Sequence, residues 1–215
     1  MAEPARKYER DDEVDAALRA IGGGALTQEI LWNALVFGEA ERRTCTEDDP
    51  GTLTGMVGWG RPIRSLREQL RPKKWRREEP KSLPLVVSPD RDVAITVASG
   101  DEQTGNARSA FAATKWDKGK MLLDWVDPSR QMTLDDALEE GGVPEALPDL
   151  WILLVFRTST EIHAELSRPT SVTPDDRLRF GGDRIFLKPI PIDQTLPFED
   201  EDDDEPPTEV SVERL

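Results

Sequence analysis

Five consecutive residues, Lys73-Lys74-Trp75-Arg76-Arg77, combine four cations with one indole ring. Cations displace the counterions condensed on nucleic-acid phosphates, and a flat aromatic ring offers a base a stacking surface. The arginines just before this pentapeptide recur every three or four residues, which places them along one side of a helix. These features predict a nucleic-acid-binding surface within residues 61–77, formed by Arg64, Arg67, Arg71, Lys73, Lys74, Trp75, Arg76 and Arg77.

A second, weaker pairing of cations with an indole ring lies at Lys115, Trp116 and Lys118, and we assign it to the same predicted surface. Another interpretation fits both clusters equally well. In it the tryptophans anchor into the core while the cations pair with nearby carboxylates.

Charge is segregated along the 215 residues, whose formal net charge is −15. Residues 61–81 carry nine basic and three acidic side chains, a net charge of +6. Residues 193–215 carry ten acidic side chains and one arginine, a net charge of −9. Because salt screens charges beyond about 8–10 Å, each cluster sets its own local field despite the overall sign.

The acidic segment 191–215 contains few large apolar residues and is predicted to be a disordered tail. Such a tail could improve solubility, contact a partner or fold back on the basic segment. Its residues Gln194 to Phe198 resemble the short peptides that bind the bacterial sliding clamp, which implies a protein partner of that kind. The candidate partner-binding residues are Gln194, Leu196, Phe198, Asp200, Asp202, Asp203 and Asp204.

Catalytic and metal sites have weaker signals, and we predict no catalytic residue, no cofactor and no metal. Glu161, His163 and Glu165 alternate along one expected strand and form an outside candidate for a divalent cation, with Asp101 as a further ligand for a metal-dependent hydrolase. Residues 100–105 resemble a phosphate-binding loop but lack the lysine and hydroxyl residue that the motif requires.

Helices are expected first along the chain. Apolar residues at helical spacing predict a helix ending before Gly22 and a second one capped by Thr27. The polar, glycine-rich residues 45–60 predict a loop, and Pro62 predicts the first turn of a third helix ending at Pro72. Two short helices are expected over residues 121–126 and after Thr133.

Strands are expected mainly in the second half. Alternating apolar residues predict a hairpin of residues 83–87 and 93–97, followed by a polar loop over 99–120. Residues 150–156 are predicted to form a strand covered on both faces. Residues 162–166 are predicted to form a strand with one solvent-exposed (wet) face, and residues 184–188 a further strand. The expected fold class is α+β, with N-terminal helices and a mainly antiparallel sheet of about five strands.

This pattern predicts one domain over residues 9–190, with a helical part (9–72) and a sheet part (83–190), and then the tail. Helices followed by a hairpin also resemble the element order of a winged helix-turn-helix, although the expected loop between the second and third helices is too long for that motif.

Three segments, Ala94 to Gly105, Thr114 to Gly119, and Ala164 to Ser167 with Arg184 and Ile185, are similar to uncharacterised proteins of plasmids and phages. The resemblance spans residues 40–190. It implies a mobile genetic element as the setting and no assigned activity.

Together these observations favour a non-enzymatic, nucleic-acid-associated accessory protein whose acidic tail competes for the basic segment or recruits a partner. The alternative is an acidic protein, such as an inhibitor, that binds a basic surface of a host protein. One cysteine excludes an intramolecular disulfide, and no apolar run approaches the roughly 20 residues of a membrane span. No secretory signal is visible, so we expect a cytoplasmic protein without a membrane partner.

Overall fold

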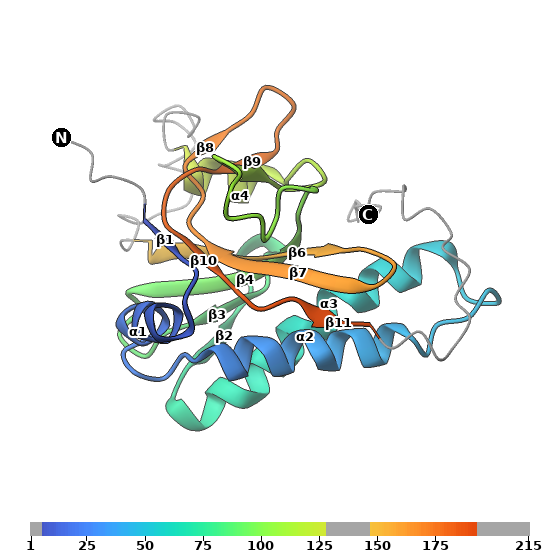
Figure 1. Ribbon diagram of the computed structural model, residues 1–215, viewed down its shortest axis with the longest axis horizontal. Helices are drawn as coiled ribbons and strands as arrows, with labels where there is room; N and C mark the ends of the chain where they lie inside the picture. The colour runs from blue at the N-terminus through green and yellow to red at the C-terminus, as the bar shows by residue number, and fades with distance from the viewer. Residues whose placement is uncertain (1–5, 128–146, 193–215) are drawn as a thin grey trace, which may run out of the picture.

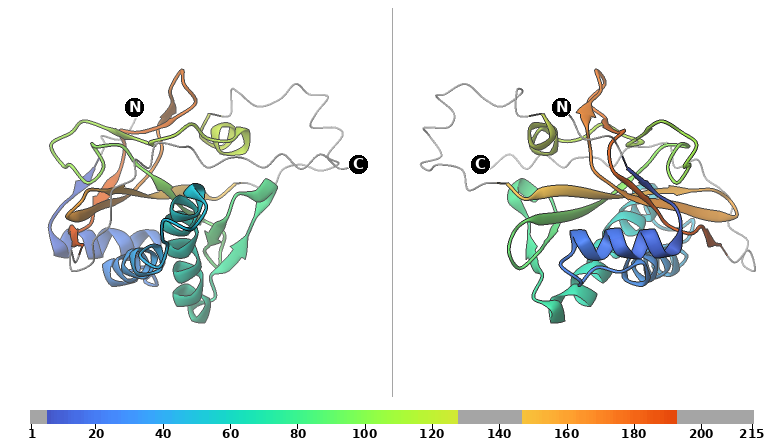
Figure 2. Two further views of the ribbon diagram at one scale, coloured as in Figure 1. Left: turned by 90° about the vertical axis from the view of Figure 1, so that its right-hand side faces the viewer. Right: turned by 60° about the vertical axis from the view of Figure 1, so that its left-hand side comes forward.

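The computed structural model describes residues 6–127 and 147–192, which form three layers (Figure 1). A central sheet of eight strands has three helices packed on one face. A small sheet of three strands and one short helix cover part of the other face, as the edge-on views in Figure 2 show.

The helical layer consists of α1 (Asp11–Ile21), α2 (Gln28–Arg42) and α3 (Gly51–Leu70). The first two helices confirm the predictions from the sequence. Thr27 caps α2 as expected, because its side-chain oxygen accepts a hydrogen bond from the Ile30 N–H at 3.3 Å.

The start of the third helix was predicted wrongly. Helix α3 begins at Gly51, so most of the expected loop over 45–60 is helical and Pro62 lies inside the helix rather than in its first turn. The interior proline is buried at the contact with α2, where a Cβ on Gly38 would lie 2.5 Å from Pro62 Cγ. A proline inside a helix removes one backbone hydrogen bond, so an isolated segment with this sequence would disfavour the helix. The close packing of Pro62 against Gly38 stabilises it in the folded protein.

The strands of the central sheet follow the order β1, β10, β7, β6, β4, β3, β2, and β11 pairs with β7. Their bounds are Lys7–Tyr8 (β1), Arg76–Glu78 (β2), Leu85–Val87 (β3), Val93–Ser99 (β4), Asp149–Arg157 (β6), Glu161–Ser167 (β7), Arg184–Phe186 (β10) and Ile190–Pro191 (β11). The small sheet consists of β5 (Ala112–Ala113), β9 (Leu178–Phe180) and β8 (Ser171–Val172), and the short helix beside it is α4 (Lys120–Val126). Two short 3₁₀ turns, η1 (Arg71–Lys73) and η2 (Pro80–Ser82), flank β2.

The α+β class is confirmed, as are the hairpin of β3 and β4 and the helix α4. The sheet is mainly antiparallel, as expected, but it is larger than predicted and includes two parallel pairings, β4 with β6 and β1 with β10. Strands of two or three residues, such as β1 and β2, are too short to show the alternation that identifies a strand in sequence. The helix expected after Thr133 lies outside the described residues.

Strand β6 was expected to be covered on both faces, and the structure confirms this. Trp151 and Leu153 belong to the core under α1, α2 and α3, whereas Leu150, Ile152 and Leu154 belong to the core under the small sheet and α4. A winged helix-turn-helix is not seen in the described residues, because eight residues (43–50) link α2 to α3 and the β3–β4 hairpin is part of the large sheet.

Candidate nucleic-acid interface

The basic segment turns sharply between the end of α3 and the edge strand β2. Pro72 lies in the 3₁₀ turn η1, and Lys74 ends that turn in the left-handed conformation at φ 67°. The Trp75 N–H then donates to the Leu70 carbonyl oxygen at 3.3 Å. This turn sets the arginines of the helix opposite those of β2.

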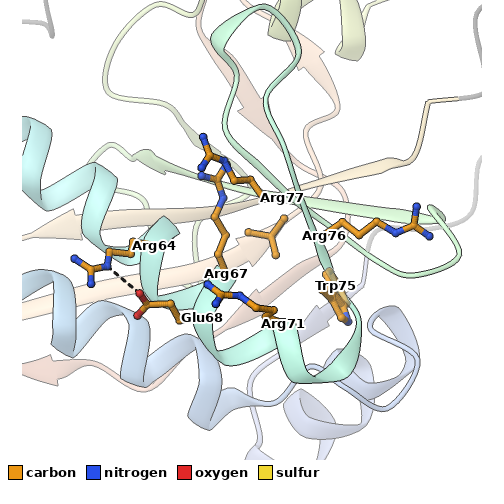
Figure 3. A pocket seen from close by; sticks show the side chains of 8 residues that line it. Arg64, Arg67, Glu68, Arg71, Trp75, Arg76 and Arg77 are labelled. Atoms are coloured by element: carbon orange, nitrogen blue, oxygen red, sulfur yellow. Dashed lines mark hydrogen bonds and ion pairs between the residues drawn. The ribbon is translucent and has the colours of Figure 1, made fainter.

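A groove of about 290 Å³ separates the last turns of α3 from β2. Val86 of the neighbouring strand β3 is the one aliphatic residue in its lining. Figure 3 shows Arg67 and Arg77 extending toward one another, and Arg76 pointing away from both. The full lining is Arg64, Arg67, Glu68, Arg71, Trp75, Arg76, Arg77 and Val86.

Carboxylates of the same fold neutralise part of this charge. Arg64 Nε lies 3.0 Å from a Glu68 oxygen, and Arg67 and Arg77 each lie 2.8 Å from one oxygen of Glu79. The hydrogen bonds from Arg77 and then Arg67 lower the pKa of Glu79, so this carboxylate stays ionised at neutral pH. For these arginines the alternative interpretation, intramolecular pairing, is the one that the structure supports.

Four other cations of the predicted surface, Arg71, Lys73, Lys74 and Arg76, have no carboxylate partner among the described residues. Lys73 Nζ donates to the Ala25 carbonyl at 2.6 Å, and Arg76 Nη2 donates to the Pro89 carbonyl at 3.0 Å. Arg71 and Lys74 make no side-chain hydrogen bond or ion pair within residues 6–127 and 147–192. All four side chains are exposed, so a cationic surface smaller than expected persists at the end of the groove.

Trp75 does not have the role predicted for it. The residue is 5% exposed and belongs to the core formed with Leu70 and Val86, because the turn after α3 directs the ring inward. A ring in that position has no free face for a base, so the expectation that Trp75 stacks on nucleic acid is wrong.

The second cluster of cations does not join the first. Lys115 Nζ sits 4.9 Å from the centre of the Trp116 ring, which is a cation–π contact within the protein. These two residues line a depression of about 430 Å³ beside the small sheet, together with Asp117, Asp175, Asp176 and Arg177. Three carboxylates against two cations make that depression unsuitable for a polyanion.

Lys118 is part of the same cluster, and burial lowers the pKa of its ammonium group, with Asp117 opposing the shift. The backbone N–H of Lys118 donates to Asp176 at 2.9 Å, which ties this residue to the loop before β9. The structure therefore separates Lys115, Trp116 and Lys118 from the groove at β2.

The outside metal candidate on β7 does not form a cluster. His163 Nε2 lies 3.4 Å from Glu161, but Glu165 is fully buried and both its oxygens bond to Arg184. Asp101 accepts hydrogen bonds from the N–H groups of Gln103 and Ala113. Within the described part of the chain, no three histidine, cysteine or acidic residues come together as metal ligands would.

The wet face expected for β7 is confirmed at Glu161 and His163, whose side chains are 45% and 30% exposed, but is wrong at the other end of the strand. Glu165 and Ser167 are buried, because the loop after β4 covers this end of the strand and supplies hydrogen-bond partners. The candidate partner-binding residues of the tail, Gln194 to Asp204, lie outside the described residues.

The sequence indicated the basic segment, but three components of the site were not predicted. Glu68 lines the groove and pairs with Arg64. Glu79 links Arg67 to Arg77, and Val86 comes from the next strand. The pairing of Glu79 with Arg77 could have been predicted, because the two residues are only two positions apart. Its bond to Arg67 could not, because the two residues are twelve positions apart and separated by a turn.

No protein-family model matches the chain, and comparison with curated proteins and with solved structures found no match. None of the helices in the described ranges combines the length and the apolar character needed to cross a bilayer.

Proposed function

We propose that this chain is a non-enzymatic accessory protein that binds nucleic acid through the groove between α3 and β2 and the exposed turn beside it. One observation carries the proposal. Arg71, Lys74 and Arg76 are exposed, clustered and without a carboxylate partner among the described residues, in a chain whose net charge is −15. A local excess of positive charge in an acidic protein favours an anionic ligand at that place.

The expected mode of binding follows from which groups are exposed. Guanidinium groups form two parallel hydrogen bonds with phosphate oxygens, and each neutralised phosphate releases condensed counterions. Trp75 is buried and cannot stack on a base. Binding should therefore be weak, insensitive to base sequence and steeply dependent on salt, with a logarithmic slope of about −2 to −4 for three to four phosphate contacts.

The acidic residues 193–215 add a second part to the proposal. Their net charge of −9 makes them a competitor for the same cations. Removal of this segment should strengthen nucleic-acid binding, and the effect should fade as salt screens both interactions.

The test is fluorescence anisotropy with labelled single-stranded DNA, double-stranded DNA and RNA. The variant Arg71→Glu/Lys74→Glu/Arg76→Glu should bind at least tenfold more weakly than the native chain, because repulsion replaces attraction at three sites. A matched control, Arg19→Glu/Arg108→Glu/Lys120→Glu, makes the same change in net charge at exposed positions on other elements and should bind normally. Trp75→Phe should also bind normally.

If Arg71→Glu/Lys74→Glu/Arg76→Glu bound nucleic acid with native affinity, the assignment of the binding surface would be overturned. If the native chain binds no nucleic acid but captures a basic protein, and loss of residues 193–215 abolishes that capture, the alternative of an acidic protein-binding module takes its place.

A further inference from the structure

The charges that face the groove do not cancel. Five arginines line the groove, and one of them, Arg76, points away from Arg67 and Arg77 and donates to the Pro89 carbonyl (Figure 3), which leaves Arg64, Arg67, Arg71 and Arg77. Two carboxylates oppose them, because Glu68 pairs with Arg64 and Glu79 is shared between Arg67 and Arg77. The excess is two positive charges, and it is confined to a groove of about 290 Å³.

The arginines of the groove have different capacities for a ligand. Arg67 is 16% exposed and already donates from all three guanidinium nitrogens, to Glu79, Glu78 and Leu85. Its role is therefore to fix the position of β2 and β3 relative to α3. Arg77 donates from Nη2 to Glu79 and is 67% exposed. Arg71 has no side-chain partner among the described residues. Arg71 and Arg77 therefore have free donors for an added anion.

The shape of the site limits the kind of phosphate that fits it. A phosphodiester inside a strand carries one negative charge and continues on both sides, whereas the groove concentrates its excess charge at one concave place. A phosphomonoester carries about −1.5 to −2 at pH 7 and three strong acceptor oxygens. Its charge matches the excess, and its oxygens match the fork geometry of two guanidinium groups.

We infer that the groove binds the terminal phosphomonoester of a nucleic-acid strand, with Arg71 and Arg77 as the contacting cations. The inference rests on the proposed function, since the strand reaches the groove through the same cationic surface. Lys74 lies outside the groove lining and contacts the internal phosphates of that strand.

The test compares oligonucleotides of one sequence that differ only at the end: 5′-phosphate, 3′-phosphate or hydroxyl at both ends. At equal salt, the preferred phosphorylated strand should bind about tenfold more tightly than the hydroxyl strand, the gain expected from charge-assisted hydrogen bonds to one added group. Arg71→Gln should abolish this preference. Lys74→Gln, the matched control at an exposed cation outside the groove, should weaken all strands equally and leave the ratio unchanged.

Free nucleoside monophosphate and inorganic phosphate are the competitors that identify the source of the phosphate. If either binds as tightly as the phosphorylated strand, the groove is a site for a small phosphate and the strand-end inference is overturned. If phosphorylated and hydroxyl strands bind equally, and Arg71→Glu/Lys74→Glu/Arg76→Glu binds neither of them, this inference is overturned and the proposed function stands. A native chain that binds no oligonucleotide overturns both.

Discussion

Glu165 and Arg184 are both fully buried and meet through two parallel hydrogen bonds, Nε to Oε1 at 2.9 Å and Nη2 to Oε2 at 2.6 Å. The same guanidinium donates to the carbonyls of Gln103 and Ser109, and Glu165 accepts from the Gly105 N–H. This pair therefore fastens the loop after β4 to strands β7 and β10.

Replacement of Glu165 by Gln should destabilise the protein by about 3–5 kcal/mol, because it leaves the Arg184 charge buried without a counter-ion. Urea unfolding followed by circular dichroism measures this loss. The exposed pair of Arg168 and Asp149, at 3.2 Å, provides the control, and Asp149→Asn should cost about 1 kcal/mol or less. Equal effects at the two sites would contradict the structural role assigned to the buried pair.

The contact between α2 and α3 gives a second prediction. A methyl group on Gly38 would meet Pro62 Cγ at 2.5 Å, so Gly38→Ala should destabilise the helix pair by about 1–3 kcal/mol through overpacking. Gly55 lies in α3 with nothing within 4 Å of the corresponding position. Gly55→Ala should therefore stabilise the protein by up to about 1 kcal/mol, since alanine loses less entropy in a helix.

Thermal and urea unfolding of the two alanine variants should thus shift in opposite directions. Destabilisation by both would mean that the glycines are needed for a reason other than the close approach to Pro62.

The sequence predicted the elements that have a strong periodic signal. Residues 150–156 form an unbroken apolar run, and in the structure they are the central strand that both cores share. Helix α3 was mislocated because Pro62 is typical of a first turn, and its packing against Gly38 is a tertiary contact that local pattern does not encode.

The sequence predicted which segment contains the candidate site, but not which of its residues are free to bind a ligand. Nothing local distinguishes Arg67, whose partner Glu79 lies twelve residues away, from Arg71, which has no side-chain partner in the described ranges. Glu165 was assigned to the solvent-exposed face because the alternation of apolar and polar residues shows only which side of a strand a residue lies on. It does not report that a loop 60 residues earlier covers that side.

Lys118 gives a prediction about pH. Burial lowers the pKa of its ammonium group below the ordinary value of 10.5, so in the interval between the two values the unfolded chain binds more protons than the folded chain. The free energy of unfolding contributed by this group therefore rises with pH across that interval, and the penalty for the buried charge is fully present below it.

Lys118→Met should accordingly raise the melting temperature at neutral pH, and the gain over the native chain should shrink as the pH approaches 10.5. Differential scanning calorimetry across this range measures the effect. Lys120 is exposed in the first turn of α4, and Lys120→Met should give no such pH-dependent difference. A constant offset between Lys118→Met and the native chain would contradict the predicted titration.

Glu79 is the counter-ion shared by two groove arginines, so its charge should set the affinity of the groove for anions. Glu79→Gln removes one negative charge beside Arg67 and Arg77 and should tighten oligonucleotide binding by up to about fivefold at low salt, equivalent to about 1 kcal/mol. Fluorescence anisotropy across a salt series measures the change. Glu41→Gln, which releases Arg61 outside the groove lining, makes the same change in net charge and is the control. Equal gains in both variants would show that overall charge, rather than the groove, governs binding.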